Sequence, residues 1–467
     1  MARSRTSSEL ELLVPLDRAA TEPIHRQLAA GVRAGIRSGR LGARAPLPSS
    51  RALAAQLGVS RGVVVAAFEQ LVAEGYLQAV PGGATRVAAG AVSGGLPARS
   101  LELVRYEFDF RPGRPDVTAF PRAAWLRSLR RALASAPADR LTYRSGHGLP
   151  ELRVALAGYL NRVRGTAAEP ADIVVASGFA QGLGLLARAL AQGGARRFAL
   201  EDPFDPEYRA IVRAGGLEPV PIPVDELGMR VELLAGAEVA GALVTAAHQY
   251  PTGAVLAPER RATLLAWARS TGAIVVEDDY DAEYRYDRAP IGALQGLAPS
   301  EVVYAGSASK TLAPGLRLGW LVAPPALAER LVAVKESIDQ GSPALDQLAY
   351  ADLLEHGEVD AHLRRMRPIY RRRRDVLLEA LASFLPGLAP VGAAAGLHVL
   401  AYLPDGVDDV ALAQRAAEAG VAVGALTPRR VAPGRGGLIF GYGTIPEGQI
   451  RAGVERLAEL MGSAAGD

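Results

Sequence analysis

The alternation of short apolar segments with helical segments constrains the fold of this chain most strongly. From Phe108 onward, apolar segments such as DIVVAS and RRFALED are each followed by a stretch with the apolar spacing of a helix. Alternating units of this length predict a largely parallel sheet with helices on both faces. We therefore expect an α/β domain over residues 106–467, with a helical stretch after about residue 340 and then a smaller α/β part.

The N-terminal ninety residues follow a different pattern. Residues 23–38 carry apolar side chains at intervals of four, which predicts an amphipathic helix. Two more helices are expected over residues 51–57 and from Ser60 to about Gly75, each preceded by a serine that can cap it and separated by Gly58. This order is typical of a helix-turn-helix, and the following residues, YLQAVPGGATRVA, predict a hairpin with a glycine-rich tip.

Length and charge indicate two domains with different roles. A chain of 467 residues is too long for one core. Residues 88–100, AAGAVSGGLPARS, have the small side chains of a linker, which we expect over residues 90–105. We therefore expect an N-terminal domain over residues 12–89. Residues 1–90 contain eleven arginines, no lysine and six acidic residues, a net charge of +5, whereas the whole chain carries +3. A basic head on a nearly neutral body predicts that any contact with nucleic acid lies in the head.

Other classes of protein are disfavoured by what the sequence lacks. No apolar run approaches the ~18 residues of a membrane span, and the N-terminal residues MARSRTSSELELL lack the apolar stretch of a signal peptide. With no cysteine there is neither a disulfide frame nor a thiolate metal site, and the six histidines are scattered. We expect a cytoplasmic protein without a bound metal.

Lysine is rare in this chain. Of the 52 basic residues only Lys310 and Lys335 are lysines, so arginine is used wherever a positive charge suffices. A retained lysine then indicates chemistry that arginine cannot perform. Forming a Schiff base is one such reaction, because it needs a primary amine with an accessible neutral form. Lys335, in LVAVKESI, is expected to be an ordinary exposed helix position.

Four segments that follow expected strands suit one type of ligand, and open α/β sheets bind ligands at such strand ends. GSASKTLAPGLRLGW combines a lysine with hydroxyls and an arginine that can grip a phosphate. AIVVEDDYDAEYRY ends in clustered acids, where a protonated ring nitrogen would relieve the repulsion. A solvated acidic loop or a divalent-metal site is the alternative for that segment. SGFAQG offers backbone N–H groups at a helix start, and HQYPTG is a turn after a strand.

Residues 15–89 closely resemble the GntR-type winged helix. The resemblance is carried by the motifs PIHRQL, LPSSR, LGVSR and EGYL and by the wing PGGATRV. It implies contacts with double-stranded DNA at a phosphate, in the major groove and near the minor groove. The residues implied, in that order, are Arg51, then Ser60, Arg61 and Gly62, then Gly82 and Gly83.

One departure concerns the second helix of that motif. Related proteins often carry a polar or basic residue there, whereas this chain has Val63, Val64 and Val65. Base readout would then rest on few side chains and on DNA shape. A helical module used only for protein contacts is the alternative.

Residues 106–460 resemble the fold-type I aminotransferases, and behind a GntR-type head they resemble the MocR/GabR-type regulators. The resemblance implies pyridoxal 5′-phosphate (PLP) held by Lys310 as a Schiff base, with Asp278 on the pyridine nitrogen and Tyr280 near the ring hydroxyl. Tyr143, in LTYRSGHG, would reach the phosphate of a neighbouring subunit in a head-to-tail homodimer. The other residues implied around the phosphate are Ala180, Gln181, Ser307, Ser309 and Arg317.

Two departures from that family bear on the ligand. Asp205 stands where relatives commonly have a tyrosine, so Phe204 would stack on the cofactor ring in its place, or the stacking would be lost. In GLIFGYG, Ile439 occupies the position where aminotransferases usually carry the arginine for the substrate carboxylate. The clamp is then missing or is supplied by another arginine. The candidates are Arg429, Arg430 and Arg435.

The sequence thus favours a PLP-dependent DNA-binding transcriptional regulator over two alternatives. Its effector would be PLP itself or an amino compound that displaces Lys310. The first alternative is an active aminotransferase with an accessory DNA-binding domain, against which the missing carboxylate arginine argues. The second is a cofactor with a purely structural role.

Overall fold

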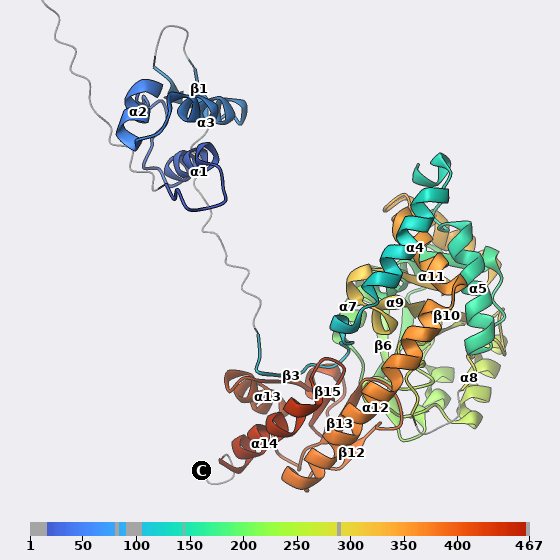
Figure 1. The fold of residues 1–467 in the computed structure, drawn as a ribbon. Helices are drawn as coiled ribbons and strands as arrows, with labels where there is room; N and C mark the ends of the chain where they lie inside the picture. The colour runs from blue at the N-terminus through green and yellow to red at the C-terminus, as the bar shows by residue number, and fades with distance from the viewer. Residues whose placement is uncertain (1–15, 80–83, 90–104, 143–144, 287–290, 464–467) are drawn as a thin grey trace, which may run out of the picture. The chain divides into compact units, whose positions relative to one another are not determined.

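The computed structural model describes residues 16–79, 84–89, 105–142, 145–286 and 291–463. The chain divides into two compact units, residues 1–104 and residues 105–467 (Figure 1). In the part of the chain that is described, no helix is both long enough and apolar enough to cross a membrane.

The smaller unit is a winged helix, as the sequence predicts. Its described residues form three helices and a two-stranded antiparallel sheet: α1 (Ile24–Arg37), α2 (Ser50–Leu57), α3 (Arg61–Ala73), β1 (Leu77–Gln78) and β2 (Arg86–Val87). The Ser49 hydroxyl accepts a hydrogen bond from the Ala52 N–H and so caps α2. Gly58 ends α2 in the left-handed conformation, at φ 62°, which lets the chain turn directly into α3. Leu28 of α1 and Val64 of α3 are fully buried in the core of this unit.

The larger unit is built on an eight-stranded sheet in the order β4-β11-β10-β9-β8-β5-β6-β7. The five strands from β10 to β6 are parallel, whereas β11 and β7 pair antiparallel with their neighbours. The expectation of a largely parallel sheet is therefore confirmed. The strands are β4 (Ile173–Ala176), β5 (Arg197–Asp202), β6 (Glu218–Asp225), β7 (Gly228–Met229), β8 (Gly241–Val244), β9 (Ile274–Asp278), β10 (Val302–Ser307) and β11 (Gly319–Val322).

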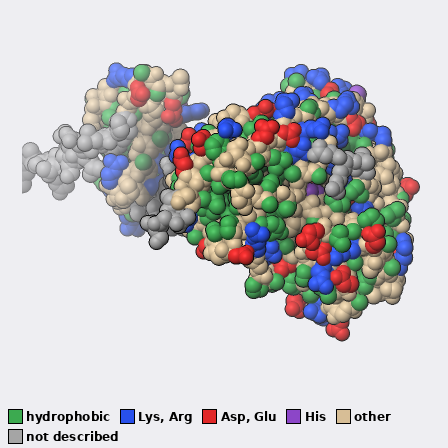
Figure 2. Space-filling view, turned by 90° about the horizontal axis from the view of Figure 1, so that it is seen from below, with side chains coloured by type: hydrophobic (Ala, Val, Ile, Leu, Met, Phe, Trp, Pro, Cys, Tyr) green, Lys and Arg blue, Asp and Glu red, His purple; other side chains and the backbone are tan. Residues whose placement is uncertain are grey.

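Apolar clusters cover both faces of this sheet. Val174 of β4 and Val276 of β9 belong to one cluster, whereas Val175 and Val275 belong to two others, as expected when alternate side chains point to opposite faces. The helices that surround the sheet are α4 (Arg122–Ser135), α5 (Pro150–Arg164), α6 (Phe179–Gln192), α7 (Pro206–Ala214), α8 (Pro258–Thr271), α9 (Ala308–Thr311), α10 (Pro325–Glu336) and α11 (Ala344–Glu355). Figure 2 shows that hydrophobic side chains also reach the surface of the larger unit, between basic and acidic ones.

A smaller five-stranded sheet follows the long helix α12 (Glu358–Phe384), in the order β12-β13-β15-β14-β3. Its edge strand β3 comes from the start of the unit and pairs parallel with β14, so the entering chain is part of this sheet. Helix α12 extends from the large sheet toward the small one (Figure 1). The remaining elements are β3 (Phe108–Phe110), β12 (Pro390–Val391), β13 (His398–Tyr402), α13 (Asp409–Glu418), β14 (Val421–Ala425), β15 (Gly437–Gly441) and α14 (Glu447–Ser463).

The expectation that Lys335 is exposed is wrong. Its side chain on α10 is fully buried, and its ammonium group donates to both carboxylate oxygens of Asp339, at 2.8 and 2.7 Å. Burial alone would raise the pKa of the Asp339 carboxyl, but hydrogen bonds from Lys335 and from the Gly341 N–H hold this pKa below its usual range. The apolar neighbours in LVAVKESI were the signal for burial, because an amphipathic helix would place Lys335 beside them.

Removing the carboxylate from this pair should destabilise the larger unit. In Asp339→Asn the buried Lys335 ammonium loses its counter-charge, which we expect to cost about 3 kcal/mol at neutral pH and to lower the melting temperature by several degrees. The difference in stability between the wild type and Asp339→Asn should shrink as the pH falls through the lowered pKa of Asp339. Protonation of Asp339 then removes the ion pair from the wild type as well. Thermal unfolding followed by circular dichroism measures it.

Glu232→Gln is the matched control, since it breaks the exposed Arg230–Glu232 pair, where each side chain is close to half exposed. Pairs of that kind contribute less than about 1 kcal/mol. Equal melting temperatures for Asp339→Asn and Glu232→Gln would contradict the importance of the buried pair.

Candidate functional site

A cavity of about 230 Å³ lies where β9 and β10 end at the C-terminal edge of the large sheet. Neighbouring parallel strands end at the same edge of a sheet. Asp278, at the end of β9, and Lys310, just after β10, therefore meet here although they are distant in the sequence. The residues that line the cavity are Pro112, Gly113, Phe204, Asp205, Glu207, Tyr208, Tyr250, Asp278, Tyr280 and Lys310.

Lys310 reaches the cavity from the short helix α9, directly after β10. Its Nζ donates a hydrogen bond to the Gly113 carbonyl oxygen, at 2.6 Å. Burial lowers the pKa of the Lys310 amine, although Asp278, Asp281 and Asp205 act in the opposite direction. A lowered pKa increases the neutral fraction of the amine at a given pH, and the neutral form is the nucleophile that attacks an aldehyde.

Asp278, the last residue of β9, presents a buried carboxyl group to the same cavity. Burial raises the pKa of this carboxyl well above its usual range, the nearby Asp279 raises it further, and the positive charge of Lys310 lowers it. A cationic group bound beside Asp278 would favour the charged carboxylate again. The site is thus suited to a protonated ring nitrogen.

The two acids beside Asp278 do not share its surroundings. Glu277 accepts hydrogen bonds from the Leu294 and Gln295 N–H groups. Asp279 forms a buried ion pair with Arg164, at 2.6 Å. All three acids are buried, so the alternative of a solvated acidic loop is wrong. Only the middle acid faces the cavity, because the outer two are turned to partners within the protein.

Tyr280 is held by a buried polar cluster behind the cavity. Its hydroxyl lies 3.2 Å from His248 Nδ1, which also lies 2.9 Å from an Asp281 carboxylate oxygen. The ring of His398, from β13, lies 5.0 Å from the His248 ring. The cluster therefore joins the strand ends of the large sheet to the small sheet, a connection that the scattered histidines of the sequence did not indicate.

Arg317 lies against the turn that opens helix α6. Its Nη2 donates to the Ser177 carbonyl oxygen, at 2.5 Å. Gly178 is needed in this turn, because a Cβ there would lie 2.8 Å from the Arg317 Nη2 and the residue has φ +83°. Ala180 follows in the first turn of α6, so the guanidinium and the N–H groups of a helix start are side by side, as in sites for phosphate. Ser307 and Ser309 lie half-buried at the β10–α9 junction.

Gln181 connects this turn to the buried lysine. Its Oε1 accepts from the Ser177 N–H, at 2.7 Å, and its Nε2 donates to Asp339, at 2.5 Å. Asp339 in turn binds Lys335. Sequence reasoning missed this chain of contacts, although the scarcity of lysine marked Lys335 as well as Lys310. The buried Lys335 is thus connected, through Asp339 and Gln181, to the turn that Arg317 contacts.

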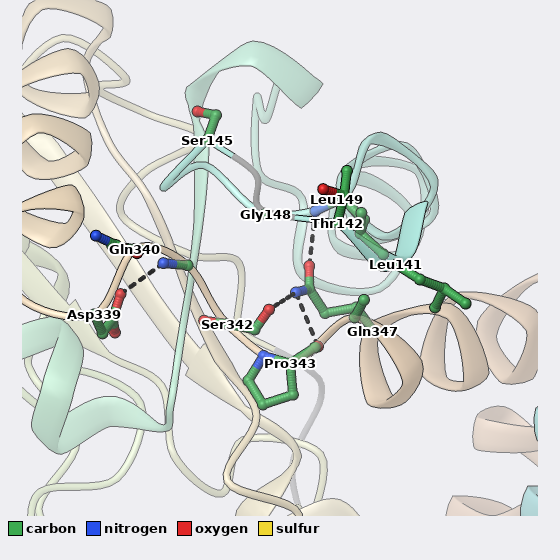
Figure 3. A pocket seen from close by; sticks show the side chains of 12 residues that line it. Leu141, Thr142, Ser145, Gly148, Leu149, Asp339, Gln340, Ser342, Pro343 and Gln347 are labelled. Carbon is green, nitrogen blue, oxygen red and sulfur yellow. Dashed lines mark hydrogen bonds between the residues drawn. The ribbon is translucent and has the colours of Figure 1, made fainter. Parts of the chain in front are cut away.

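Asp339 also borders a second cavity, of about 660 Å³ (Figure 3). Gln347 fixes its wall, because its amide nitrogen donates to the Ser342 and Pro343 carbonyl oxygens and its amide oxygen accepts from the Leu149 N–H. The lining residues are Leu141, Thr142, Ser145, Gly148, Leu149, Asp339, Gln340, Gly341, Ser342, Pro343, Ala344 and Gln347. Thr142 and Ser145 flank Tyr143, the residue expected to reach the phosphate of a neighbouring subunit, but Tyr143 lies outside the described residues.

The position expected for a carboxylate arginine is apolar. Ile439 on β15 is fully buried and packs with Leu400 and Leu426. Of the candidate substitutes, Arg429 contacts a residue of the cavity lining, because its Nε donates to the Tyr250 hydroxyl, at 3.1 Å. Among the described residues no arginine lines the 230 Å³ cavity. The other two candidates, Arg430 and Arg435, are therefore not part of its lining.

Asp205, which stands where relatives commonly have a tyrosine, lies at the start of α7. The Phe204 side chain is buried, lines the cavity and packs 5.6 Å from the Tyr208 ring. Asp205 caps α7 by accepting from the Glu207 N–H. An aromatic ring is therefore still present at the cavity, one position before the place where relatives carry it.

The residues of the helix-turn-helix expected to meet DNA are accessible. Arg51, Ser60, Arg61 and Gly62 are all exposed, and Arg61 Nε lies 3.3 Å from the Ser50 hydroxyl. Of the three valines that follow, Val64 is a core residue. Gly82 and Gly83 lie outside the described residues.

Comparison with known proteins identifies both units. Residues 24–87 match the gntR family of bacterial regulatory proteins, and residues 115–457 match the aminotransferase class I and II family. A crystal structure of an archaeal alanine:glyoxylate aminotransferase superposes with a TM-score of 0.71 at 28% identity, covering 77% of this chain and 91% of the other. This fold is that of PLP-dependent enzymes, and the amine, the buried carboxyl and the arginine-lined helix start described above fit such a cofactor.

Two curated relatives match nearly the whole chain. The probable rhizopine catabolism regulatory protein MocR of Rhizobium meliloti is 33% identical, covering 95% of both chains. The pyridoxine biosynthesis transcriptional regulator PdxR of Corynebacterium glutamicum is 34% identical, covering 92% of this chain and 94% of the relative. Because the match runs through the winged helix and the aminotransferase-like unit alike, this chain belongs to the MocR/GabR-type transcriptional regulators.

Proposed function

We propose that the protein binds operator DNA through its winged helix and that the state of a PLP cofactor on Lys310 sets its DNA affinity or geometry. One observation carries this proposal: Lys310 and Asp278 meet in one cavity of a chain that also has a DNA-binding unit. When bound, PLP supplies an aldehyde that an amine can attack and a ring that withdraws electrons. Lys310 would supply the amine, Asp278 would hold the ring nitrogen and Arg317 would bind the phosphate.

The Lys310 contact supplies a route from the cavity toward the DNA-binding unit. The Lys310 Nζ contacts the Gly113 carbonyl oxygen, so a change in what is bonded to this nitrogen acts on the segment around Gly113. Gly113 lies three residues after the end of the edge strand β3, through which the chain enters the larger unit. An effector then changes DNA binding only as far as it favours one arrangement of this segment over the other.

The rival function, an active aminotransferase, lacks a specific feature that transamination of amino acids uses. No arginine lines the cavity among the described residues, and Ile439 occupies the expected position with an apolar side chain.

We assign three parts to the chain: a DNA-binding domain over residues 12–89, a linker over 90–105 and an effector domain over 106–467. A regulator of this kind works where the chromosome is, which places it in the cytoplasm.

We also propose that the protein is a head-to-tail homodimer in which Tyr143 reaches the phosphate of the other subunit. Helix α4 supports an interface, because Leu126 and Leu133 lie seven residues apart on one face and are 46% and 51% exposed. Leu141, just after this helix, is 58% exposed. Large apolar side chains repeated on one helix face are typical of a surface that a second chain covers.

Replacing Lys310 should abolish covalent cofactor binding. Wild-type protein incubated with PLP and reduced with borohydride should gain the mass of one cofactor on the peptide that contains Lys310, whereas Lys310→Ala should gain none. Glu232→Gln is the control, since it changes an exposed side chain and leaves the reacting amine in place. Mass spectrometry of the digested protein measures the outcome, and trapped cofactor on Lys310→Ala would refute the assignment.

Arg51→Ala and Arg61→Ala should weaken binding to the promoter region beside the protein's own gene. Each loss of a phosphate contact reduces the dependence of log affinity on log salt by about one unit. Arg26→Ala, an exposed position on α1, is the matched control and should bind like the wild type. Fluorescence anisotropy at several salt concentrations provides the measurement, and wild-type affinity and slope in both variants would contradict the groove assignment.

Leu133→Arg should shift the protein toward monomer, because a charge would then be buried in the proposed interface. Light scattering coupled to gel filtration gives the mass. Val410→Arg on α13, where the valine is 42% exposed, is the control and should leave the mass unchanged. A dimeric Leu133→Arg protein would exclude this face of α4 as the interface.

A further inference from the structure

Two carboxylates line the cavity without a part in holding the cofactor. Asp205 is half-buried and Glu207 is exposed, and both border the cavity beside Phe204 and Tyr208. One oxygen of Asp205 accepts the Glu207 N–H, at 2.9 Å, and neither carboxylate forms an ion pair within the described residues. Both therefore remain free to bind a cation that enters the cavity.

The charges around the cavity are unevenly distributed. Its charged lining consists of Lys310 and three acids, Asp205, Glu207 and Asp278. Lys310 is used by the aldehyde of the cofactor and Asp278 by the ring nitrogen, which leaves a net charge of about −2 for the ligand to meet. The Asp205 carboxylate raises the pKa of the Lys310 amine, so its field reaches the reacting nitrogen. No arginine belongs to the described lining, and Arg209, which interacts electrostatically with Asp205 from outside it, donates its hydrogen bonds to backbone carbonyl oxygens.

We propose that the effector is a diamine, or another amino compound with a second cationic group and no free carboxylate. One amino group takes the place of Lys310, and the second cation lies against Asp205 and Glu207. This inference rests on the proposed function, in which an amine displaces Lys310 from the cofactor.

The exchange needs no oxidant or reductant. The effector nitrogen forms a C=N bond to the cofactor's aldehyde carbon while the C=N bond to Lys310 breaks. The two protons that the effector nitrogen loses equal the two that the Lys310 nitrogen gains, and no electrons leave the pair. Lys310 is then free to donate to the Gly113 carbonyl oxygen.

An amino acid fits this cavity less well. A free carboxylate would meet the negative charges of Asp205 and Glu207, and like charges brought together in a partly buried site destabilise the complex. Arg429 forms no ion pair with either acid, and its Nε and Nη1 donate to the Tyr250 hydroxyl and the Ala425 carbonyl oxygen. The same two acids thus attract a second ammonium group and repel a carboxylate.

The test compares three amines of equal chain length on the full-length, cofactor-loaded protein. Putrescine carries two ammonium groups, n-butylamine carries one, and γ-aminobutyrate carries one with a carboxylate. Titrations followed by the cofactor absorbance give a dissociation constant for each. We expect putrescine to bind about tenfold more tightly than n-butylamine, since two partly exposed carboxylates each contribute a few-fold, and γ-aminobutyrate to bind most weakly.

Charge-removing variants assign the preference to these residues. Asp205→Asn keeps the helix cap and Glu207→Gln keeps the side-chain length, so the double variant should bind putrescine and n-butylamine equally. Glu259→Gln is the matched control, because Glu259 also follows the proline that begins its helix, α8, and is exposed. This control should keep the wild-type preference.

The possible outcomes separate the inference from the function on which it rests. If borohydride traps no cofactor on the wild type, the proposed function fails. If cofactor is trapped but γ-aminobutyrate binds as tightly as putrescine, or the double variant keeps the preference, only the diamine inference is overturned. Absorbance that responds to none of the three amines also overturns it, and leaves PLP itself as the effector.

Discussion

The burial of an amine and a carboxyl group in one cavity is the interaction on which the site of this protein depends. Burial disfavours the charged form of both Lys310 and Asp278, so each side chain is placed in the cavity at a cost in free energy. Their pKa values shift in opposite directions, toward a neutral amine and a neutral acid. A cofactor that reacts with the first and brings a cation to the second removes both penalties at once. The parallel sheet makes this arrangement possible, because β9 and β10 end at the same edge.

The sequence predicted the fold well because the relevant signals are local. Apolar periodicity and glycine turns define the winged helix, and alternation of strands and helices defines the parallel sheet. The antiparallel strand β11 inside that sheet could not be predicted in the same way, since pairing direction depends on the connection and not on the apolar pattern of GWLV. The role of β3 as an edge strand of the small sheet depends on contacts more than 300 residues apart.

For the site, motif residues were easier to predict than their partners. Lys310, Asp278 and Tyr280 stand in compact motifs, and the structure brings them into one cavity. The contacts of Gln181 with Asp339 and of Tyr280 with His248 join segments that are distant in sequence, so no local spacing reveals them. Lys335 is a different case, because its signals were local. Its burial follows from its apolar neighbours, and its carboxylate partner Asp339 is only four residues further along the chain.

Asp205 combines two tasks that are usually separate, because it begins helix α7 and also contributes charge to the cavity. Few side chains can cap a helix, chiefly those of aspartate, asparagine, serine and threonine, and losing the cap costs about 1 kcal/mol. The choice of ligand charge at this position is therefore restricted by the folding of the helix. A change from a cationic to a neutral ligand is open through a single substitution that keeps the cap, whereas a change to an anionic ligand would weaken the start of α7. The route by which such a regulator acquires a new specificity is thus biased by the stability of a nine-residue helix.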